Sequence, residues 1–379
     1  MLGHGGANHP ETPVHAKTLR PLIAGLVLGL LANTASLAAS LEQMAGQMII
    51  VGFKGDSVKD KSVIALRKAV AEGRVGGVMY LKYNVASLSA VKAMNEAFKG
   101  ASPELPPFLT LDQEGGSVER LTKDVGFPEI PNAQTVAARN DPAGAQAIYA
   151  GMAKDMAALG FTVNFGPVVD LNINPKNLII AKYGRAFSKD PATVDAYAQA
   201  FINAHHAEGM LTSIKHFPGH GSSTADSHAG FVDITKTWSE AELQPYKDLL
   251  AGGYDDFVMV GHLYHKDYDG GGQRLPASLS PDWITGVLRG KLGYNGVVIS
   301  DDLEMGAIRK RFTLNETVIQ AVNAGMDVLL FSNTAAYDPA LGDEILGILV
   351  AQAGKDPNFA KRIEESYGRI VALKGRIGG

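Results

Sequence analysis

Eight short apolar runs alternate with amphipathic stretches along the chain, and this alternation limits the fold more than any other feature. The runs have strand length and end at turn residues, whereas the stretches between them have helical length. The runs are residues 48–53, 76–80, 107–111, 161–170, 211–216, 257–261, 296–300 and 326–331. The clearest helical stretches are residues 58–72, 136–159, 191–208, 240–251 and 281–292. Eight strands, each followed by a helix, predict an α/β fold of the (β/α)8 TIM-barrel type.

A doubly wound open sheet is the competing architecture. That fold usually carries a G-x-G-x-x-G phosphate loop after its first strand. Here the first run ends Val51-Gly52-Phe53-Lys54-Gly55, which lacks that pattern. No low-complexity linker or composition shift interrupts the rest of the chain. We therefore expect a single barrel domain over residues 40–379, and we expect the stretch 359–377, with its Arg and Lys, to be a solvated outer helix.

The first 39 residues have the composition of an export signal. Lys17 and Arg20 precede an apolar run at residues 22–32, and small residues continue to Ala39. The run is short for a bilayer span but suits a cleavable signal peptide. An uncleaved membrane anchor is the alternative interpretation. We predict a signal peptide at residues 1–39 and an exported protein, periplasmic or secreted, with no stable membrane association after cleavage.

Composition excludes several classes of protein. The formal net charge of -4 gives no basic surface for nucleic acid. The chain has no cysteine, which excludes disulfides, thiolate metal sites and a cysteine nucleophile.

Ionisable residues gather where the predicted strands end. Those at the end of a predicted strand or directly after it are Asp112, Asp170, Lys215, His216, His262, Asp301 and Asp302. Strand carboxyl ends meet at one mouth of a barrel, which is where its active sites lie. Carboxylates accept hydrogen bonds from hydroxyls and Lys or Arg donate to them, so this mouth suits a polyhydroxylated ligand. It also supplies the carboxylate and the separate proton donor that glycoside hydrolysis requires.

The densest segment is Lys215-His216-Phe217-Pro218-Gly219-His220-Gly221, followed by Asp226-Ser227-His228. Glycine and proline place these side chains on a loop at the end of a strand. Residues two apart in an extended loop point to the same side, so Asp226 and His228 can meet. A neighbouring carboxylate orients an imidazole and favours its charged form, and an imidazole exchanges protons near neutral pH. This pair is therefore a candidate general acid/base.

Five motifs in this order resemble glycoside hydrolase family 3, and within it the single-barrel β-N-acetylhexosaminidases. They are Asp112-Gln113-Glu114-Gly115-Gly116, Gly184-Arg185-Ala186-Phe187, the segment from Lys215 to Gly221, Asp226-Ser227-His228 and Ser300-Asp301-Asp302-Leu303. The resemblance covers almost the whole chain after residue 39. It implies a retaining exo-β-N-acetylhexosaminidase that acts on terminal β-N-acetylglucosaminides and needs no cofactor and no metal.

The resemblance also assigns roles to residues of this chain. Asp301 would be the nucleophile, and His228, oriented by Asp226, the acid/base. The residues expected to hold the sugar are Asp112, Arg120, Arg185, Lys215 and His216. The Phe217–Pro218 bond is a candidate cis peptide. Ser117 stands where the family commonly has arginine, so contacts beyond the first sugar are expected to differ.

Structural roles are the simpler interpretation for several other residues. Asp302 is expected to cap the following helix, because aspartate is a favoured N-cap. Asp170, His262 and Glu114 are expected to support the barrel mouth. For His220 a structural and a catalytic role are equally consistent with the sequence.

Rival functions also fit parts of the pattern. A metallohydrolase is one, since His216, His220, Asp226 and His228 are competent ligands, although Lys215 would repel a cation. A silent sugar-binding protein is another, although it would need neither nucleophile nor acid. Within the family, a β-glucosidase remains open. So does a phosphorylase, which transfers the sugar to phosphate instead of water, because a histidine acid/base repels the phosphate anion less than a carboxylate would.

Overall fold

The computed structural model describes residue 3, residues 39–102 and residues 104–377. The predicted signal peptide therefore lies almost entirely outside the described residues. Within the described part of the chain, no helix has both the length and the apolar character needed to span a bilayer.

Eight parallel strands form the barrel, in the order β10-β1-β2-β3-β4-β5-β7-β9. Their bounds are β1 Ile49–Gly52, β2 Gly77–Met79, β3 Phe108–Leu111, β4 Val163–Asn164, β5 Leu211–Phe217, β7 Phe257–Val260, β9 Val297–Ser300 and β10 Leu329–Phe331. A bridge between Ile299 and Val328 joins β9 to β10 and closes the ring. The strands are buried along their lengths, as expected for a parallel sheet covered by helices. Each lies within a predicted apolar run or extends it by one residue, so the (β/α)8 prediction is confirmed.

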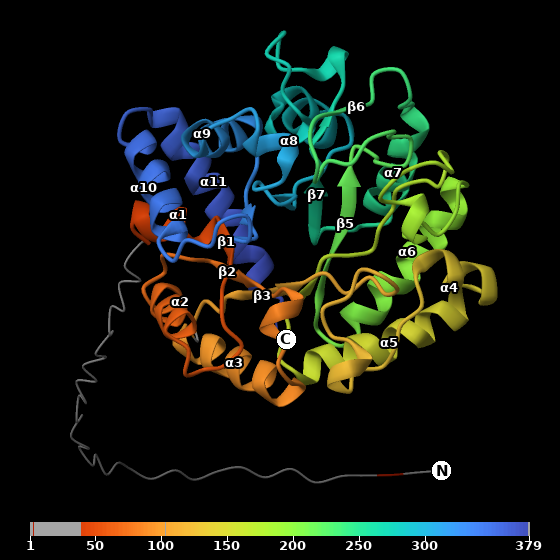
Figure 1. The fold of residues 1–379 in the computed structure, drawn as a ribbon, viewed down its shortest axis with the longest axis horizontal. Helices are drawn as coiled ribbons and strands as arrows, with labels where there is room; N and C mark the ends of the chain where they lie inside the picture. Colours follow the sequence, from red (N-terminus) through yellow and green to blue (C-terminus); the bar gives the residue numbers. More distant parts are fainter. Residues whose placement is uncertain (1–2, 4–38, 103, 378–379) are drawn as a thin grey trace. The chain divides into compact units, whose positions relative to one another are not determined.

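A helix follows each barrel strand and packs outside it (Figure 1). These are α2 Lys61–Ala71, α3 Leu88–Ala101, α5 Pro142–Ala158, α6 Pro191–His206, α7 Gln244–Ala251, η7 Asp282–Lys291, α9 Leu314–Ala324 and α10 Leu341–Ala353. Two further helices, α1 Leu41–Gln47 and α11 Pro357–Lys374, pack against each other. The beginning and the end of the barrel domain therefore lie side by side.

The predicted helix at residues 136–159 is two helices, α4 Ala133–Arg139 and α5. Asp141 caps α5 by accepting a hydrogen bond from the Gly144 amide at 2.8 Å. Pro142 follows at the first helical position, where its missing N–H and fixed φ favour a helix start. The apolar periodicity continues across this break, so a prediction from periodicity alone merges the two helices into one.

A second, two-stranded sheet lies at the carboxyl end of the barrel. Its strands are β6 Val232–Asp233 and β8 Leu263–Tyr264, and they pair in parallel. Figure 1 shows β6 beyond the end of β5 and near α8 Gly306–Arg309. This sheet joins the loop after β5 to the loop after β7, so it braces the rim of the barrel mouth.

Candidate active site

Two carboxylates and three cations form a network over the ends of β3 and β5. Lys215 Nζ donates to Asp112 Oδ1 at 2.7 Å and lies 2.6 Å from Glu114 Oε1. Arg120 donates to Asp112 Oδ2 at 2.9 Å. Arg185 donates twice to Glu114, from Nε at 2.8 Å and from Nη2 at 2.7 Å. With three positive charges against two negative ones, the network keeps donor capacity for a hydroxylated ligand.

Burial by itself would raise the pKa of Asp112 and of Glu114, but the neighbouring cations lower both. Lys215 and Arg120 act on Asp112, whereas Arg185 and Lys215 act on Glu114. Burial by itself would lower the pKa of Lys215, yet the same two carboxylates raise it. All these groups therefore remain charged near neutral pH. Glu114, expected only to support its loop, is the residue that fixes Arg185.

Asp170 orients the histidines of the loop that follows β5. It is buried, and it accepts hydrogen bonds from the His216 amide at 3.2 Å, the His220 amide at 2.7 Å and His216 Nδ1 at 2.7 Å. Because His216 donates from Nδ1, its Nε2 is the acceptor for Arg185 Nη2 at 3.3 Å. Asp170 therefore has the supporting role expected for it, and His216 joins the Arg185 network.

The Phe217–Pro218 bond is cis, as predicted, and Lys215–His216 and Gly166–Pro167 are also cis. His220 is buried against two serines, with Nδ1 2.6 Å from Ser223 Oγ and Nε2 3.3 Å from Ser227 Oγ. Burial lowers the pKa of His220 to about 4, so this ring is neutral. Both of its nitrogens are engaged within the loop, which favours a structural role.

Asp301 lies at the end of β9, and its amide donates to Val260 O at 3.0 Å. Burial would raise its pKa, but His262, His216 and His228 act in the opposite direction and hold it at about 2. Asp301 is therefore ionised near neutral pH. His262 donates to Asp302 O from Nε2 at 2.8 Å and contacts Ser278 Oγ at 2.7 Å, which is a supporting position.

Asp302 does not cap a helix, so that expectation is wrong. Its Oδ1 accepts hydrogen bonds from the amides of Glu304 at 3.1 Å and Ser332 at 2.9 Å. The next helix, α8, begins only at Gly306, and Met305 precedes it. Asp302 thus ties the end of β9 to the end of β10, a contact that sequence spacing does not reveal.

Asp226 and His228 form the expected pair on the loop after β5. Asp226 Oδ1 accepts hydrogen bonds from the His228 amide and from His228 Nδ1, both at 2.8 Å. The His228 side chain is 64% exposed and that of Asp226 is 32% exposed. The second ring nitrogen of His228 thus belongs to a side chain that solvent or ligand can reach.

This loop is fastened to the segment that follows Asp301. The Gly306 amide donates to His228 O and the Ala307 amide to Ser227 O, both at 3.1 Å. Lys310 Nζ donates to Ala229 O at 2.8 Å. A Cβ atom on Gly306 would lie 2.6 Å from His228 O, so only glycine permits this approach. Although about seventy positions separate them in sequence, the imidazole and the β9 carboxylate belong to adjoining segments, and the sequence contained no signal for this docking.

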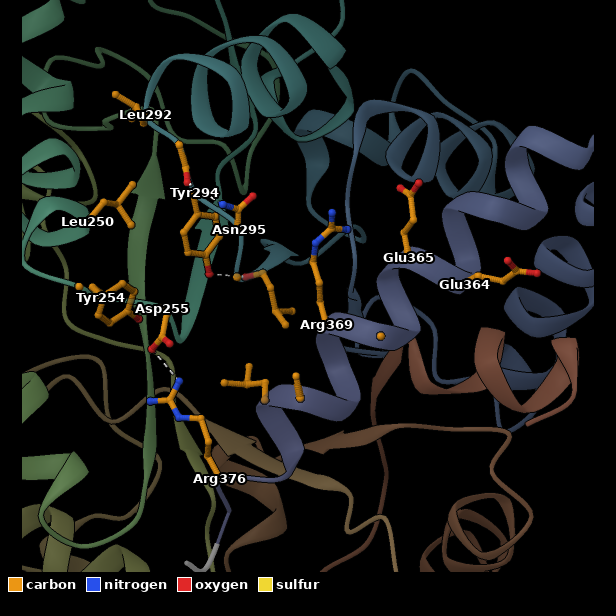
Figure 2. A pocket seen from close by; sticks show the side chains of 17 residues that line it. Leu250, Tyr254, Asp255, Leu292, Tyr294, Asn295, Glu364, Glu365, Arg369 and Arg376 are labelled. Carbon is orange, nitrogen blue, oxygen red and sulfur yellow. Dashed lines mark hydrogen bonds and ion pairs between the residues drawn. The ribbon is translucent and has the colours of Figure 1, made fainter. Parts of the chain in front are cut away.

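A cavity of about 740 Å³ lies at the other end of the barrel, against the starts of β7 and β9 and against α11 (Figure 2). Both arginines of its lining are already paired: Arg376 with Asp255 at 2.7 Å, and Arg369 with Asp327 at 3.1 Å. None of the predicted catalytic or sugar-binding residues lines it. Because barrel active sites lie at the carboxyl ends of the strands, this cavity is not the candidate site.

Among the described residues, no cluster of three or more His, Asp and Glu side chains is arranged to hold a metal ion. His216 is engaged by Asp170 and His228 by Asp226. His220 lies against two serines, so the four candidate ligands of a metallohydrolase are engaged in separate contacts.

Comparison with known proteins identifies the family. Residues 40–373 match the Glycosyl hydrolase family 3 N terminal domain. A Beta-hexosaminidase of Stenotrophomonas maltophilia (strain R551-3) is 34% identical over 303 residues, which cover 78% of this chain and 86% of that relative. The closed barrel and its ionisable mouth are those of a glycoside hydrolase, and the chain belongs to glycosyl hydrolase family 3.

Solved structures agree with this assignment. A glycoside hydrolase family 3 beta-N-acetylglucosaminidase from Paenibacillus sp. str. FPU-7 superposes with a TM-score of 0.80 at 32% identity, covering 89% of this chain. The chain spans 63% of the length of that protein. A Beta-N-acetylhexosaminidase from Beutenbergia cavernae DSM 12333 gives a TM-score of 0.78 at 30% identity, covering 89% of this chain and 99% of that one.

Proposed function

We propose that this protein is a retaining exo-β-N-acetylhexosaminidase that releases terminal β-linked N-acetylglucosamine from peptidoglycan fragments or chitooligosaccharides. One observation carries the proposal: the hydrogen-bonded pair Asp226–His228 sits on a loop docked to the segment that follows Asp301. The name of the relative from Beutenbergia cavernae, a Beta-N-acetylhexosaminidase, supports an N-acetylated sugar, and that of the relative from Paenibacillus, a beta-N-acetylglucosaminidase, supports N-acetylglucosamine.

In the first step Asp301 attacks the anomeric carbon while His228 protonates the departing glycosidic oxygen. In the second step His228, now neutral, takes a proton from water as that water displaces Asp301 from the sugar. Asp226 holds the ring by accepting from Nδ1, so Nε2 carries the exchanged proton. Asp112, Arg120, Arg185, Lys215 and His216 hold the sugar hydroxyls during both steps.

Two variants test the roles. Asp301→Ala is expected to show no turnover above background, because no other group forms the glycosyl-enzyme. His228→Ala is expected to lose about 100- to 10,000-fold in kcat on substrates with poor leaving groups, with an unchanged melting temperature. On a dinitrophenyl glycoside, whose leaving group needs no proton, the loss should be much smaller. Near-normal rates in either variant would contradict the assigned role.

The competing activities have direct tests. Aryl glycosides that differ only at carbon two, acetamido against hydroxyl, separate a hexosaminidase from a β-glucosidase. Product analysis with and without phosphate separates hydrolysis from phosphorolysis. Loss of activity with a strong chelator would favour a metallohydrolase.

We also propose that residues 1–39 export the protein, so that it meets its substrate in the periplasm or outside the cell. The charge and hydropathy pattern of residues 17–39 supports this. Amino-terminal sequencing of the protein recovered from the producing cells tests it, because an intact start would contradict cleavage near residue 39.

A further inference from the structure

The turn at residues 218–222 directly follows β5, and an acidic side chain contacts it on each of two sides. Asp170 accepts a hydrogen bond from the His220 amide at 2.7 Å. Glu242 accepts one at Oε2 from the Ser222 amide at 3.2 Å. The two acids come from segments far apart in the sequence, so the turn joins the end of β4 to the region before α7.

Glu242 packs closely against this turn. It belongs to the short helix η4 Glu240–Leu243, and only 1% of the residue is exposed. A Cβ atom on Gly219, whose φ is +122°, would lie 2.6 Å from Glu242 Cβ and 2.9 Å from its Oε2. Trp238, two residues before η4, donates from Nε1 to Pro218 O at 3.0 Å. The backbone of the turn therefore rests on η4, and a change at Glu242 acts directly on it.

The surroundings of Glu242 suit a neutral acid better than a carboxylate. Its Oε1 is buried and has no hydrogen-bond partner among the described residues. An ionised carboxylate in such a place lacks the donors that replace water, and here it would also face the charge of Asp170. Burial raises the pKa of Glu242 to about 8, with Asp170 acting in the same direction and hydrogen bonds from Ser222 and Gly221 opposing it.

The other ionisable side chains around the turn keep a constant charge near neutral pH. Burial would raise the pKa of Asp170, but the neighbouring histidines lower it, so this carboxylate is ionised. Burial, together with the charges of Asp170 and Glu242, raises the pKa of Tyr246 on α7 well above its usual value. Burial lowers the pKa of His220 to about 4, so its ring is neutral. Glu242 is therefore the group at this turn that changes its charge around pH 8.

We propose that Glu242, in its protonated form, is a positioning residue that holds the turn at residues 218–222 in the conformation needed for sugar binding. Ionisation of Glu242 places a second negative charge beside Asp170, which displaces the turn and disturbs the hydrogen bonds between Asp170 and His216. This inference rests on the proposed function, because His216 is among the residues proposed to hold the sugar. Sugar binding therefore weakens as Glu242 ionises, independently of the acid His228.

The pH profile of kcat/KM on a dinitrophenyl β-N-acetylglucosaminide tests this inference. The leaving group of this substrate needs no proton, so ionisation of His228 should not limit the rate. The wild-type enzyme is expected to lose kcat/KM with an apparent pKa of about 8, by up to about tenfold per pH unit above it, mainly through a rise in KM. Glu242→Gln keeps an acceptor for the Ser222 amide and cannot ionise, so its profile should stay flat over the same range.

Matched variants separate positioning from general damage. Glu240→Gln, an exposed change on η4, should keep the wild-type profile. Glu242→Ala removes the acceptor of the Ser222 amide, so KM should be raised at every pH without an alkaline fall. Glu242→Gln should restore the KM that Glu242→Ala loses, since an amide reproduces the shape of the protonated acid.

The possible outcomes can be told apart. The same alkaline fall in wild type and Glu242→Gln, or a flat profile in both, would overturn the positioning role and leave the proposed function intact. A fall in kcat at constant KM would also overturn it, because the turn would then act on the chemical step and not on sugar binding. A wild-type enzyme that cleaves no aryl β-N-acetylglucosaminide at any pH would overturn the proposed function itself.

Discussion

Asp301 and Asp302 are neighbours with opposite electrostatic surroundings. Three histidines hold the pKa of Asp301 at about 2, although burial alone would raise it. Burial raises the pKa of Asp302 to about 6, and its Oδ1 faces two backbone amides. Two adjacent carboxylates thus titrate in different pH ranges because of what surrounds them, and Asp301, the proposed nucleophile, is the one that stays ionised at mildly acidic pH.

Glu242, on the short helix η4 Glu240–Leu243, is a buried acid beneath the loop after β5. Its Oε2 accepts from the Ser222 amide at 3.2 Å, and burial raises its pKa to about 8. Between the unfolded value near 4.5 and about 8, the folded state holds the extra proton. This group's contribution to stability is therefore fully present below that window and is lost as pH rises through it.

Glu242→Gln is expected to flatten the fall in unfolding free energy between pH 5 and pH 8, since each unit of pKa difference corresponds to about 1.4 kcal/mol. Urea unfolding of wild type and variant across this range measures it. The exposed Glu240→Gln is the control and should keep the wild-type slope. Parallel curves for wild type and Glu242→Gln would show that Glu242 does not hold its proton.

At the scale of elements, the loop after β5 and helix α8 act as one unit. Two backbone hydrogen bonds and a lysine join them, and Gly306 allows the contact. The Asp226–His228 pair is therefore positioned by the segment that follows Asp301, which connects the proposed acid/base to the proposed nucleophile.

Gly306→Ala is expected to displace the loop, because the added Cβ would lie 2.6 Å from His228 O. We expect kcat to fall by about tenfold or more on poor leaving groups, as for other misplaced catalytic groups. KM and the rate on a dinitrophenyl glycoside should change little, since sugar binding is elsewhere. Steady-state kinetics on both substrates measure this.

Gly347→Ala is the matched control, because this helical glycine of α10 has nothing within 4 Å of an added Cβ. Its kinetics should be unchanged and its stability slightly increased. If Gly306→Ala lowered kcat equally on all substrates, the variant would have disturbed the whole active site, and displacement of His228 alone would not explain the loss.

For the whole molecule, α11 closes the end of the barrel opposite the active site. It was expected to be a solvated outer helix, which is wrong for several of its cations. Arg362 and Arg369 pair with the buried Asp327 at 3.4 and 3.1 Å. Lys374 is buried and donates to Gln47 Oε1 at 2.7 Å and to Gly76 O at 2.8 Å. These contacts join the last helix to α1 and to the start of β2.

Burial lowers the pKa of Lys374 to about 7. Between about 7 and the unfolded value of 10.5, the unfolded chain binds the extra proton, so the contribution of Lys374 to stability rises with pH. The unfolding free energy of wild type minus that of Lys374→Met should therefore increase from pH 7 to pH 10. Denaturant unfolding measures the difference, and the exposed Lys361→Met should show none. A constant difference would contradict the lowered pKa.

The sequence by itself determined the barrel and the membership of the site. Apolar runs of strand length with helices between them predict a parallel sheet covered on both faces, and the lack of a phosphate loop after the first run favours the closed barrel over an open doubly wound sheet. Residues near the carboxyl ends of strands, such as Lys215 and Asp301, meet at one mouth because all strands of a parallel barrel end there. The contact between Asp226 and His228 joins residues two apart, so the sequence predicted it as well.

Only the tertiary structure decided how these parts act on one another. The bidentate grip of Glu114 on Arg185, the tie from Asp302 to β10 and the docking of the His228 loop on Gly306 all join residues distant in sequence. Sequence pattern and spacing predict which face of a strand or helix a residue occupies. Its hydrogen-bond and ion-pair partners across the barrel depend on the path that each loop takes, which the pattern does not contain. Charge state follows those partners, because burial and neighbouring ions set each pKa.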